Sequence, residues 1–176
     1  MDHEEIGVGV LGWGFMGSIH SHAYRDMPSL FRPLAATPKL VAICDIVESK
    51  IEDAKERFGF PKSYNDWHSM IKDESISIVS NAFPNYLHYE PSKESAKAGR
   101  HVICEKPLAM NYEQTKDLYE TAKKAKVKHM TAFKFREIPA IQLAKKLITE
   151  GFVGDVYSVE AEFNENYAHD RNIPLN

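Results

Sequence analysis

Short apolar segments alternate with amphipathic segments along most of the chain. Segments that are apolar throughout are typical of strands buried on both faces of a parallel sheet, and the segments between them have the spacing of covering helices. The sequence therefore predicts an α/β fold with a doubly wound parallel sheet. The expected strands are 6–12 (IGVGVLG), 40–44 (LVAIC), a short one near 63–64, 76–83 (ISIVSNAF), 101–104 (HVIC) and 127–133 (VKHMTAF).

The helices are predicted from apolar residues that recur every three or four positions. A loop is expected at 28–38, because its three prolines cannot continue a helix. The first expected helix begins after residue 12, and the others lie at 51–58, 66–71, 85–98, 112–126 and 138–150. The first carries Phe15, Met16, Ile19, Ala23 and Met27 on one face, and that at 112–126 is expected to turn Tyr112, Thr115, Leu118, Tyr119, Ala122 and Ala125 inward.

The segment from Val156 to Glu165 differs, because apolar and polar residues alternate along it. Alternation is typical of an antiparallel sheet with one face in water, and a lone strand of this kind cannot bury its apolar face. We therefore expect two domains. Residues 1–135 form the parallel-sheet domain, and residues 136–176 form a connecting helix and the first strand of a second, antiparallel-sheet α/β domain.

The composition, with 43% apolar and 27% charged residues, is that of an ordinary globular protein. The net charge of −3 and the lack of a long basic stretch argue against a nucleic-acid partner. No run approaches the ~20 apolar residues of a membrane span, and the acidic N-terminus lacks the features of a signal peptide. Cys44 and Cys104 each end an apolar run and are expected to be buried thiols. We expect a cytoplasmic protein without a membrane partner.

A glycine-rich turn directly follows the first strand and opens the first helix. Its spacing fits G-x-G-x-x-G, in which the first glycine makes a tight turn, the second lets a pyrophosphate approach the backbone, and the third lets the helix pack closely. The free N–H groups of the helix would face the phosphates. The alternative is a glycine turn without a ligand. The predicted cofactor-binding residues here are Gly12, Trp13, Gly14, Phe15, Met16 and Gly17.

Asp45 ends the second strand, where a carboxylate can accept hydrogen bonds from the hydroxyls of an adenosine ribose. The same carboxylate repels a 2′-phosphate, so NAD is expected as the cofactor. Lys50 lies close enough along the chain to keep NADP possible. Asp45 could also cap the N-terminus of the next helix, with or without a ligand role.

Polar residues also follow the later strands, at the sheet edge where ligands of open α/β folds bind. Glu105 and Lys106, in the tripeptide Glu-Lys-Pro, follow the strand at 101–104, and a desolvated lysine can move protons beside a nicotinamide. Alone, such a charged pair is more often a solvated turn. Phe83, Asn85 and His88 follow the strand at 76–83, and the polar pair could meet a ligand or cap a helix.

The remaining histidines give no clear sign of a site. His20 and His22 on the first helix are expected to be packed or solvent-facing rather than ligands. No H-E-x-x-H or C-x-x-C spacing occurs, so no metal is predicted, and no G-x-S-x-G nucleophile elbow occurs either.

Taken together, GWGFMG with its following histidine, CD, FPNYLH, AGRHVICEKPLA and FKFREIPAIQLAKKLITEGFVGDV resemble the Gfo/Idh/MocA oxidoreductases, which include glucose–fructose oxidoreductase and inositol dehydrogenase. The resemblance covers nearly all of the chain and implies a Rossmann-type domain that binds NAD or NADP. It implies that Lys106 lies beside the nicotinamide, binds substrate and takes part in proton transfer, and that Pro107 is cis. Asn85 and His88 match residues near the nicotinamide. Arg136 matches an arginine after the sixth strand, and we assign it to the substrate.

Members of this family usually continue into a second domain with an open antiparallel sheet. That domain supplies an Asp and a His that act with the lysine, and most of the dimer contacts. His169 and Asp170 come too early in the chain to be that pair. A homo-oligomer is implied where a full second domain is present.

The expected function is hydride transfer between NAD(P) and a sugar, inositol or similar polyol, with Lys106 as the catalytic residue. This chain alone is expected to bind the cofactor, with turnover depending on the second domain. The alternatives are a non-catalytic NAD-binding module or partner subunit and, ranked lower, an NAD-dependent glycosidase. A methyltransferase would leave the Glu-Lys-Pro tripeptide without a role.

Overall fold

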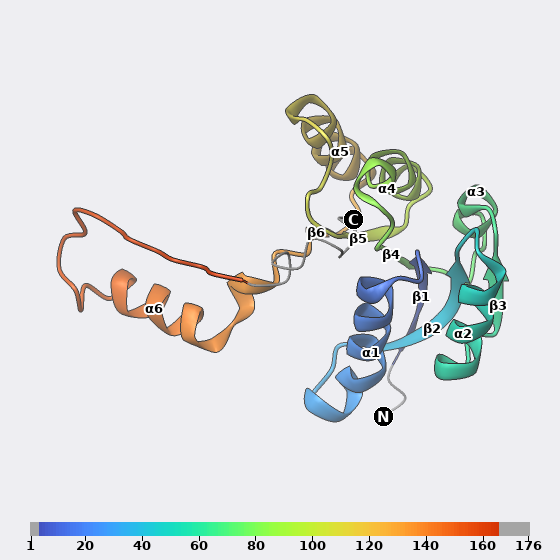
Figure 1. Ribbon diagram of the computed structural model, residues 1–176, viewed down its shortest axis with the longest axis horizontal. Coiled ribbons are helices and arrows are strands. Elements are labelled where there is room, and N and C mark those ends of the chain that lie inside the picture. The colour runs from blue at the N-terminus through green and yellow to red at the C-terminus, as the bar shows by residue number, and fades with distance from the viewer. Residues whose placement is uncertain (1–3, 166–176) are drawn as a thin grey trace. The chain divides into compact units, whose positions relative to one another are not determined.

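The computed structural model describes residues 4–165, which fall into two units that meet between Phe133 and Lys134 (Figure 1). The strands of the first unit are β1 (Glu5–Leu11), β2 (Thr37–Cys44), β3 (Lys62–Tyr64), β4 (Ile78–Asn81), β5 (His101–Cys104) and β6 (His129–Thr131). Its helices are α1 (Phe15–Leu30), α2 (Glu48–Phe58), α3 (Trp67–Ile71), the 3₁₀ turn η1 (Asn85–Leu87), α4 (Tyr89–Lys97) and α5 (Tyr112–Ala125).

The six strands form one sheet in the order β3-β2-β1-β4-β5-β6, and every neighbouring pair is parallel. From β1 the chain adds β2 and β3 toward one edge of the sheet, and it then adds β4, β5 and β6 toward the other edge. Val8 of β1 lies between Leu40 of β2 and Ile78 of β4, which fixes the central register. The strand order thus reverses between β1 and β4, where doubly wound sheets bind ligands. The predicted sheet is confirmed.

Helices cover both faces of this sheet, which explains why its central strands are apolar throughout. On one face, α1 and α2 pack over the sheet, with Tyr24 of α1 in the same buried cluster as Val10. On the opposite face, Met70 of α3 shares a cluster with Leu11. The helices α4 and α5 pack around Val102 of β5. The site residues therefore stand on a core built from both layers.

The first helix buries a different face from the one that carries its apolar residues. The buried residues of α1 are Gly17, Ser21 and Tyr24, whereas Phe15 is 79% exposed. The small residues at positions 17 and 21 let the helix approach the strands closely. The apolar stripe of α1 thus lies largely on the surface of this unit, and the close approach to the sheet decides which face is buried.

The predicted loop at 28–38 starts too early, because α1 continues through Pro28 to Leu30. Proline lacks the N–H of one helical hydrogen bond, and here the helix ends two residues later, so little of it is lost. The predicted helix at 85–98 is interrupted at His88, between the 3₁₀ turn η1 and α4.

The buried stripe of α5 is narrower than its apolar spacing predicted. Leu118 and Ala122 are buried, as expected, but Tyr112 and Tyr119 are exposed. A tyrosine has an apolar ring and a polar hydroxyl, so it can remain at a helix surface where the hydroxyl meets water. Helical spacing alone could not separate these two groups.

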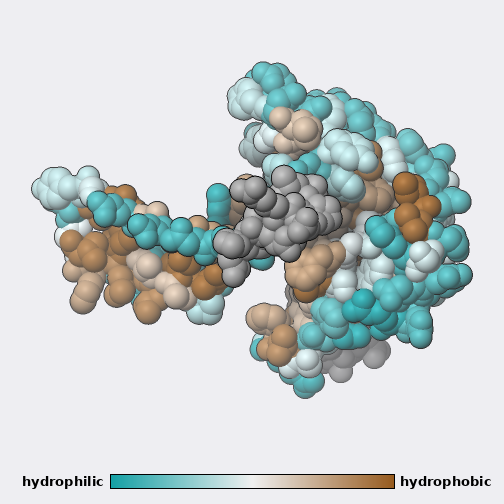
Figure 2. All heavy atoms as spheres, viewed as in Figure 1, coloured by the Kyte–Doolittle hydropathy of each residue, from teal (hydrophilic) through white to brown (hydrophobic). Residues whose placement is uncertain are grey.

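The second unit contains the 3₁₀ turn η2 (Lys134–Glu137) and α6 (Pro139–Thr149). Residues 156–165 are not assigned to a strand, and within residues 4–165 no strand pairs with them, so the antiparallel sheet of a second domain stays a prediction. Ile141, Leu143 and Phe152 are exposed, and Figure 2 shows hydrophobic residues along the surface of this unit. The predicted division after residue 135 stays a prediction, and residues 166–176, with His169 and Asp170, lie outside the described residues.

Both cysteines are free and buried, as predicted. Burial raises the pKa of the Cys44 thiol to about 12, with Asp45 and Asp66 adding to the effect. Burial likewise raises the pKa of the Cys104 thiol to about 12. Both thiols are therefore protonated and unreactive at neutral pH.

Candidate cofactor-binding site

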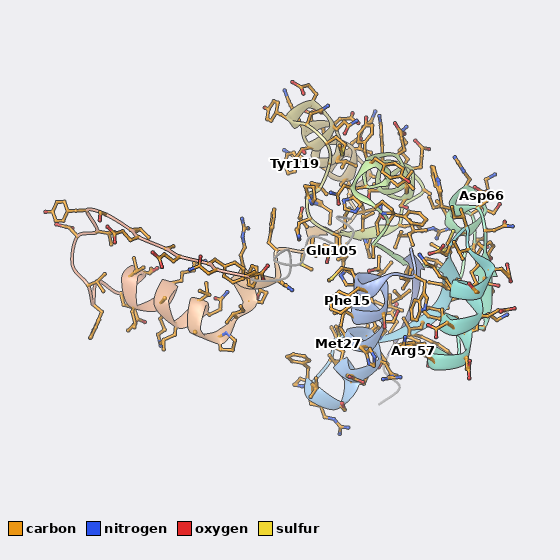
Figure 3. The ribbon with its side chains drawn as sticks, in the orientation of Figure 1. Phe15, Met27, Arg57, Asp66, Glu105 and Tyr119 are labelled. Carbon is orange, nitrogen blue, oxygen red and sulfur yellow. The ribbon has the colours of Figure 1, made fainter. Side chains whose placement is uncertain are left out.

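The predicted site residues of the first unit lie in four connections that leave the carboxyl ends of strands. Residues 12–17 follow β1, Asp45 follows β2, residues 83–88 follow β4, and residues 105–106 follow β5. Because parallel strands point the same way, these connections meet at one edge of the sheet. Figure 3 shows Phe15, at the start of α1, on the same side of this unit as Glu105.

The turn between β1 and α1 leaves open space at Gly14. Gly12 has a φ of +90°, which other residues rarely adopt, and its N–H donates to the Cys44 carbonyl at 2.8 Å. A Cβ at Gly17 would lie 2.0 Å from the Gly12 carbonyl oxygen. A Cβ at Gly14 would meet no atom within 4 Å. Gly12 and Gly17 thus serve the turn itself, whereas Gly14 leaves room for something outside the protein.

The start of α1 can supply N–H groups to an anion. Gly14 is its N-cap and makes no side-chain capping bond, and no acidic residue lies in the first turn. The first N–H groups of a helix lack partners within the helix, and the helix dipole favours negative charge there. The open space at Gly14 therefore lies beside a helix N-terminus that can bind an anion.

Asp45 joins the end of β2 to the glycine turn. Its Oδ2 accepts the main-chain N–H of Trp13 at 2.8 Å, and its Oδ1 accepts the N–H of Val47 at 3.0 Å. The N-cap of α2 is Val47, so the capping alternative for Asp45 is wrong. An ionised carboxylate has about four acceptor positions, so Asp45 retains capacity for the hydroxyls of a ribose.

The side chain of Trp13 is anchored in the core beneath the turn. Its ring lies edge-on to Phe58 and Phe60, with ring centres 5.3 and 6.0 Å away. Its indole N–H donates to Asp53 at 2.6 Å. This hydrogen bond, with a smaller contribution from Arg57, lowers the pKa of the Asp53 carboxyl below its usual range. The indole thus fixes the turn relative to α2.

A cleft of about 500 Å³ lies beside the glycine turn, a size within the range of small-molecule pockets. Its lining includes Gly14 and Phe15 of the turn and Lys50 and Arg57 of α2, so it has cationic side chains. Lys106 is not among its lining residues. The cleft corresponds to the side of the sheet that carries Asp45, where the adenosine half of a dinucleotide lies in this fold.

Replacing Asp45 with alanine is expected to lower both stability and cofactor affinity. The change removes the acceptor of two main-chain N–H groups, and hydrogen bonds to charged groups contribute about 1.5–3 kcal/mol each. A loss of about 2 kcal/mol would lower the Tm by roughly 4–8 °C in a chain of this length. Calorimetry and NAD titration measure the two effects, with the exposed Asp26→Ala as control. Unchanged NAD affinity in Asp45→Ala would contradict the ribose assignment.

The connection after β4 is organised by the buried side chain of Asn81. Its amide nitrogen donates to the carbonyls of Leu87 and His88 and to the hydroxyl of Ser92, and its oxygen accepts the N–H of Phe83. Asn81 was not among the predicted site residues, although a polar residue at the end of an apolar strand is a signal for such a role.

The predicted residues of this connection have different surroundings. Asn85 is exposed, and Phe83 is half-buried. His88 is 1% exposed, with Nδ1 at 2.6 Å from the Pro107 carbonyl oxygen and Nε2 at 2.7 Å from that of Phe83. Neither Asn85 nor His88 makes a side-chain capping bond. His88 therefore connects the segment after β4 to the segment after β5.

Glu105 is buried and bonded on both carboxylate oxygens. Oε1 lies 2.9 Å from Nε2 of His20, and Oε2 accepts the main-chain N–H of Lys106 at 3.2 Å. Lys106 itself is exposed, and its peptide bond to Pro107 is cis, as the resemblance implies. Of the charged pair, one carboxylate is thus part of the fold, and the ammonium is left available at the sheet edge.

Arg136 lies in η2, in the second unit.

Within residues 4–165, no group of three or more His, Cys, Asp or Glu side chains is placed to hold a metal ion. Across the same residues, the helices are too short or too polar to cross a membrane.

Residues 6–133 match the oxidoreductase family with the NAD-binding Rossmann fold, Gfo/Idh/MocA. The chain belongs to this family. Levoglucosan dehydrogenase of Pseudarthrobacter phenanthrenivorans is 42% identical over 172 residues, which cover 98% of this chain and 44% of that protein. Inositol 2-dehydrogenase/D-chiro-inositol 3-dehydrogenase of Lactiplantibacillus plantarum is 32% identical over 149 residues, 84% of this chain and 41% of that protein.

Solved structures of the Gfo/Idh/MocA family have the same fold. Levoglucosan dehydrogenase in complex with NADH and levoglucosan has a TM-score of 0.82 and 44% identity, over 86% of this chain and 41% of that one. An oxidoreductase domain protein from Kribbella flavida has a TM-score of 0.92 and 31% identity, over 98% of this chain and 47% of that one. The chain spans less than half the length of these relatives. The predicted family, the parallel sheet and NAD as the cofactor are thus supported.

Proposed function

We propose that this chain forms the NAD-binding part of a dehydrogenase that oxidises a secondary hydroxyl of a sugar or cyclic polyol. The observation that carries the proposal is the open space at Gly14, next to a helix N-terminus and to the fixed carboxylate of Asp45. Glycine is required by the fold at positions 12 and 17, whereas at position 14 no protein atom within 4 Å of an added Cβ would require it. Pyrophosphate and ribose are the groups that fit these two neighbouring features.

The strand order sets the direction of the bound dinucleotide. Its phosphates would lie at Gly14, and its adenosine ribose would lie at Asp45 after β2. Because β4 and β5 lie on the other side of β1, the nicotinamide half would extend over them. Asn85 and Lys106 follow those two strands and are exposed there. NAD⁺ supplies the hydride acceptor when bound.

The role assigned to Lys106 is to donate a hydrogen bond from its ammonium to the substrate hydroxyl oxygen. This bond would stabilise the charge on that oxygen as its proton passes to a base of the second domain and the hydride passes from carbon to NAD⁺. Its ammonium has no hydrogen bond or ion pair with another residue in the described part of the chain. Its main chain, in contrast, is held by Glu105. A fixed backbone and an ammonium without a protein partner in the described residues are what we expect of a residue that binds a ligand. Arg136 is a further candidate for contact with the substrate.

The substrate class proposed here is a small polyhydroxylated ring. The support comes from relatives named for levoglucosan and for inositol. Levoglucosan, myo-inositol and glucosides therefore form the first panel of substrates to be assayed. We also propose a homo-oligomer and a cytoplasmic location, which size-exclusion chromatography with light scattering and cell fractionation would test.

In a protein that includes the second domain, Lys106→Ala is expected to lower kcat for NAD⁺ reduction by about 10²–10⁴, the usual contribution of a general acid–base group. The Kd for NAD should change little, because the phosphate turn is untouched. The assay follows NADH absorbance with the panel of ring polyols, and exposed Lys116→Ala on α5 serves as a control. Full turnover in Lys106→Ala would remove this residue from the chemistry. Glycoside cleavage without net NADH formation would instead favour a glycosidase.

A further inference from the structure

We propose that His20 is a positioning residue that ties the phosphate-binding helix to the segment carrying Lys106. The inference rests on the proposed function for its catalytic meaning, but its structural claim is independent of any cofactor. His20 lies on α1, three residues beyond the last glycine of the turn. Glu105 lies 85 residues further along the chain. The imidazole is the side chain that links them.

The imidazole of His20 bridges two elements of the sheet. Its Nδ1 lies 2.7 Å from the hydroxyl of Ser80 on β4, and its Nε2 lies 2.9 Å from Oε1 of Glu105 at the end of β5. The side chains of His20 and Glu105 are 12% and 9% exposed, and Ser80 is fully buried. With the proton on Nε2, the ring donates to the carboxylate and accepts from the Ser80 hydroxyl.

This Ser–His–Glu series is not built for nucleophilic attack. Ser80 is buried in a central strand, where no substrate can reach its oxygen. What the series does is fix the rotation of the Glu105 carboxylate, since Oε1 is held by His20 and Oε2 is held by the N–H of Lys106. A buried carboxylate without such partners would be costly, so the three groups support one another.

Through His20, the helix α1 connects the parts of the domain that would hold the two ends of the cofactor. The N-terminus of α1 faces the phosphates, and one turn later the same helix holds Glu105. The main chain of Lys106 is thus held, through Glu105 and His20, by the helix that would bind the phosphates. Removing the imidazole should leave the phosphate turn intact and loosen the segment under the nicotinamide. A residue that served only stability would affect both ends alike.

The first experiment needs no cofactor and uses NMR of the whole chain. In His20→Ala, the Lys106 amide should shift and exchange with water about tenfold faster, because its hydrogen bond to Glu105 is no longer held. His20→Gln should restore the wild-type signal, since an amide can both donate to Glu105 and accept from Ser80. His129→Ala, at an exposed histidine, is the control. A Lys106 amide that is unchanged in His20→Ala would overturn the inference.

If His20→Ala fails to fold, Glu105→Gln replaces it as the test. The wild-type protein should show a His20 Nε2–H proton that exchanges slowly with water, because a buried carboxylate accepts it. In Glu105→Gln that proton should move upfield and exchange faster, since a neutral amide is a weaker acceptor than a carboxylate. A His20 ring that gives the same signal in both proteins would contradict the contact.

The second experiment links the contact to the cofactor through two fluorescence signals of bound NADH. Quenching of Trp13 reports the phosphate turn, and NADH emission reports the surroundings of the nicotinamide. His20→Ala should keep the Trp13 signal and its Kd within about threefold, and should lose at least half of the NADH enhancement, with His20→Gln restoring it. Equal loss of both signals would mean a purely structural role. If wild-type protein binds no NADH, the proposed function fails, and the NMR result alone decides the role of His20.

Discussion

Gly14→Val is expected to abolish measurable NAD binding while leaving the fold intact. The backbone at Gly14 has a φ of −108°, within the range of residues other than glycine, and a Cβ added there meets no protein atom within 4 Å. The same side chain would occupy the space where a pyrophosphate approaches the helix N-terminus. Loss of one or two charge-assisted hydrogen bonds, about 1.5–3 kcal/mol each, corresponds to a drop in affinity of roughly 10- to 10⁴-fold.

Two measurements made together test this expectation. Thermal unfolding should give a Tm close to that of the wild type, and titration with NAD should give no saturation in the wild-type range. Gly14→Ala should fall between the two, because its single methyl group fills less of the space. A folded Gly14→Val protein that binds NAD normally would show that the cofactor does not rest on this turn.

Gly17→Ala is expected to have the opposite outcome, with loss of stability as its primary effect. The added Cβ would lie 2.0 Å from the Gly12 carbonyl oxygen, a main-chain atom that can move only if the turn or α1 moves. Alanine favours a helix over glycine by about 1 kcal/mol, so the steric cost must exceed that gain. Forcing an extra group into a packed site costs about 1–3 kcal/mol or more.

The expected net loss of about 2 kcal/mol lowers the Tm by roughly 4–8 °C in a chain of this length. Calorimetry of Gly17→Ala and Gly14→Ala makes a matched pair, because both add one methyl group to glycines three residues apart. Equal stability of the two variants would contradict the different roles that the structure gives them.

The parts of the site that could be predicted are those made by local sequence. The glycine spacing after an apolar strand predicted the turn, and the apolar runs predicted five strands near their observed positions. Asp45 was placed correctly at the end of β2, but its bond to the N–H of Trp13 depends on how two connections meet. Such contacts follow from the strand order, which no single segment contains.

The His20–Glu105 contact is a clear example of a contact that could not be predicted from the sequence. A histidine on a helix and a glutamate 85 residues later give no signal in sequence that they touch. The same holds for His88, whose Nδ1 faces the carbonyl oxygen of Pro107, 19 residues further along the chain. The buried face of α1 was missed for a related reason. Gly17 and Ser21 are small rather than apolar, and close packing against the sheet selects them over Phe15.

A titration of the wild-type chain with NAD and, separately, with NADP tests whether the domain binds a dinucleotide at the glycine turn. Tryptophan fluorescence reports the binding, because Trp13 lies in the glycine turn while Trp67 lies in α3, on the opposite face of the sheet. Saturable binding that is at least about tenfold tighter for NAD is expected, since the Asp45 carboxylate repels a 2′-phosphate. Absence of binding of either nucleotide to the folded chain would contradict the account.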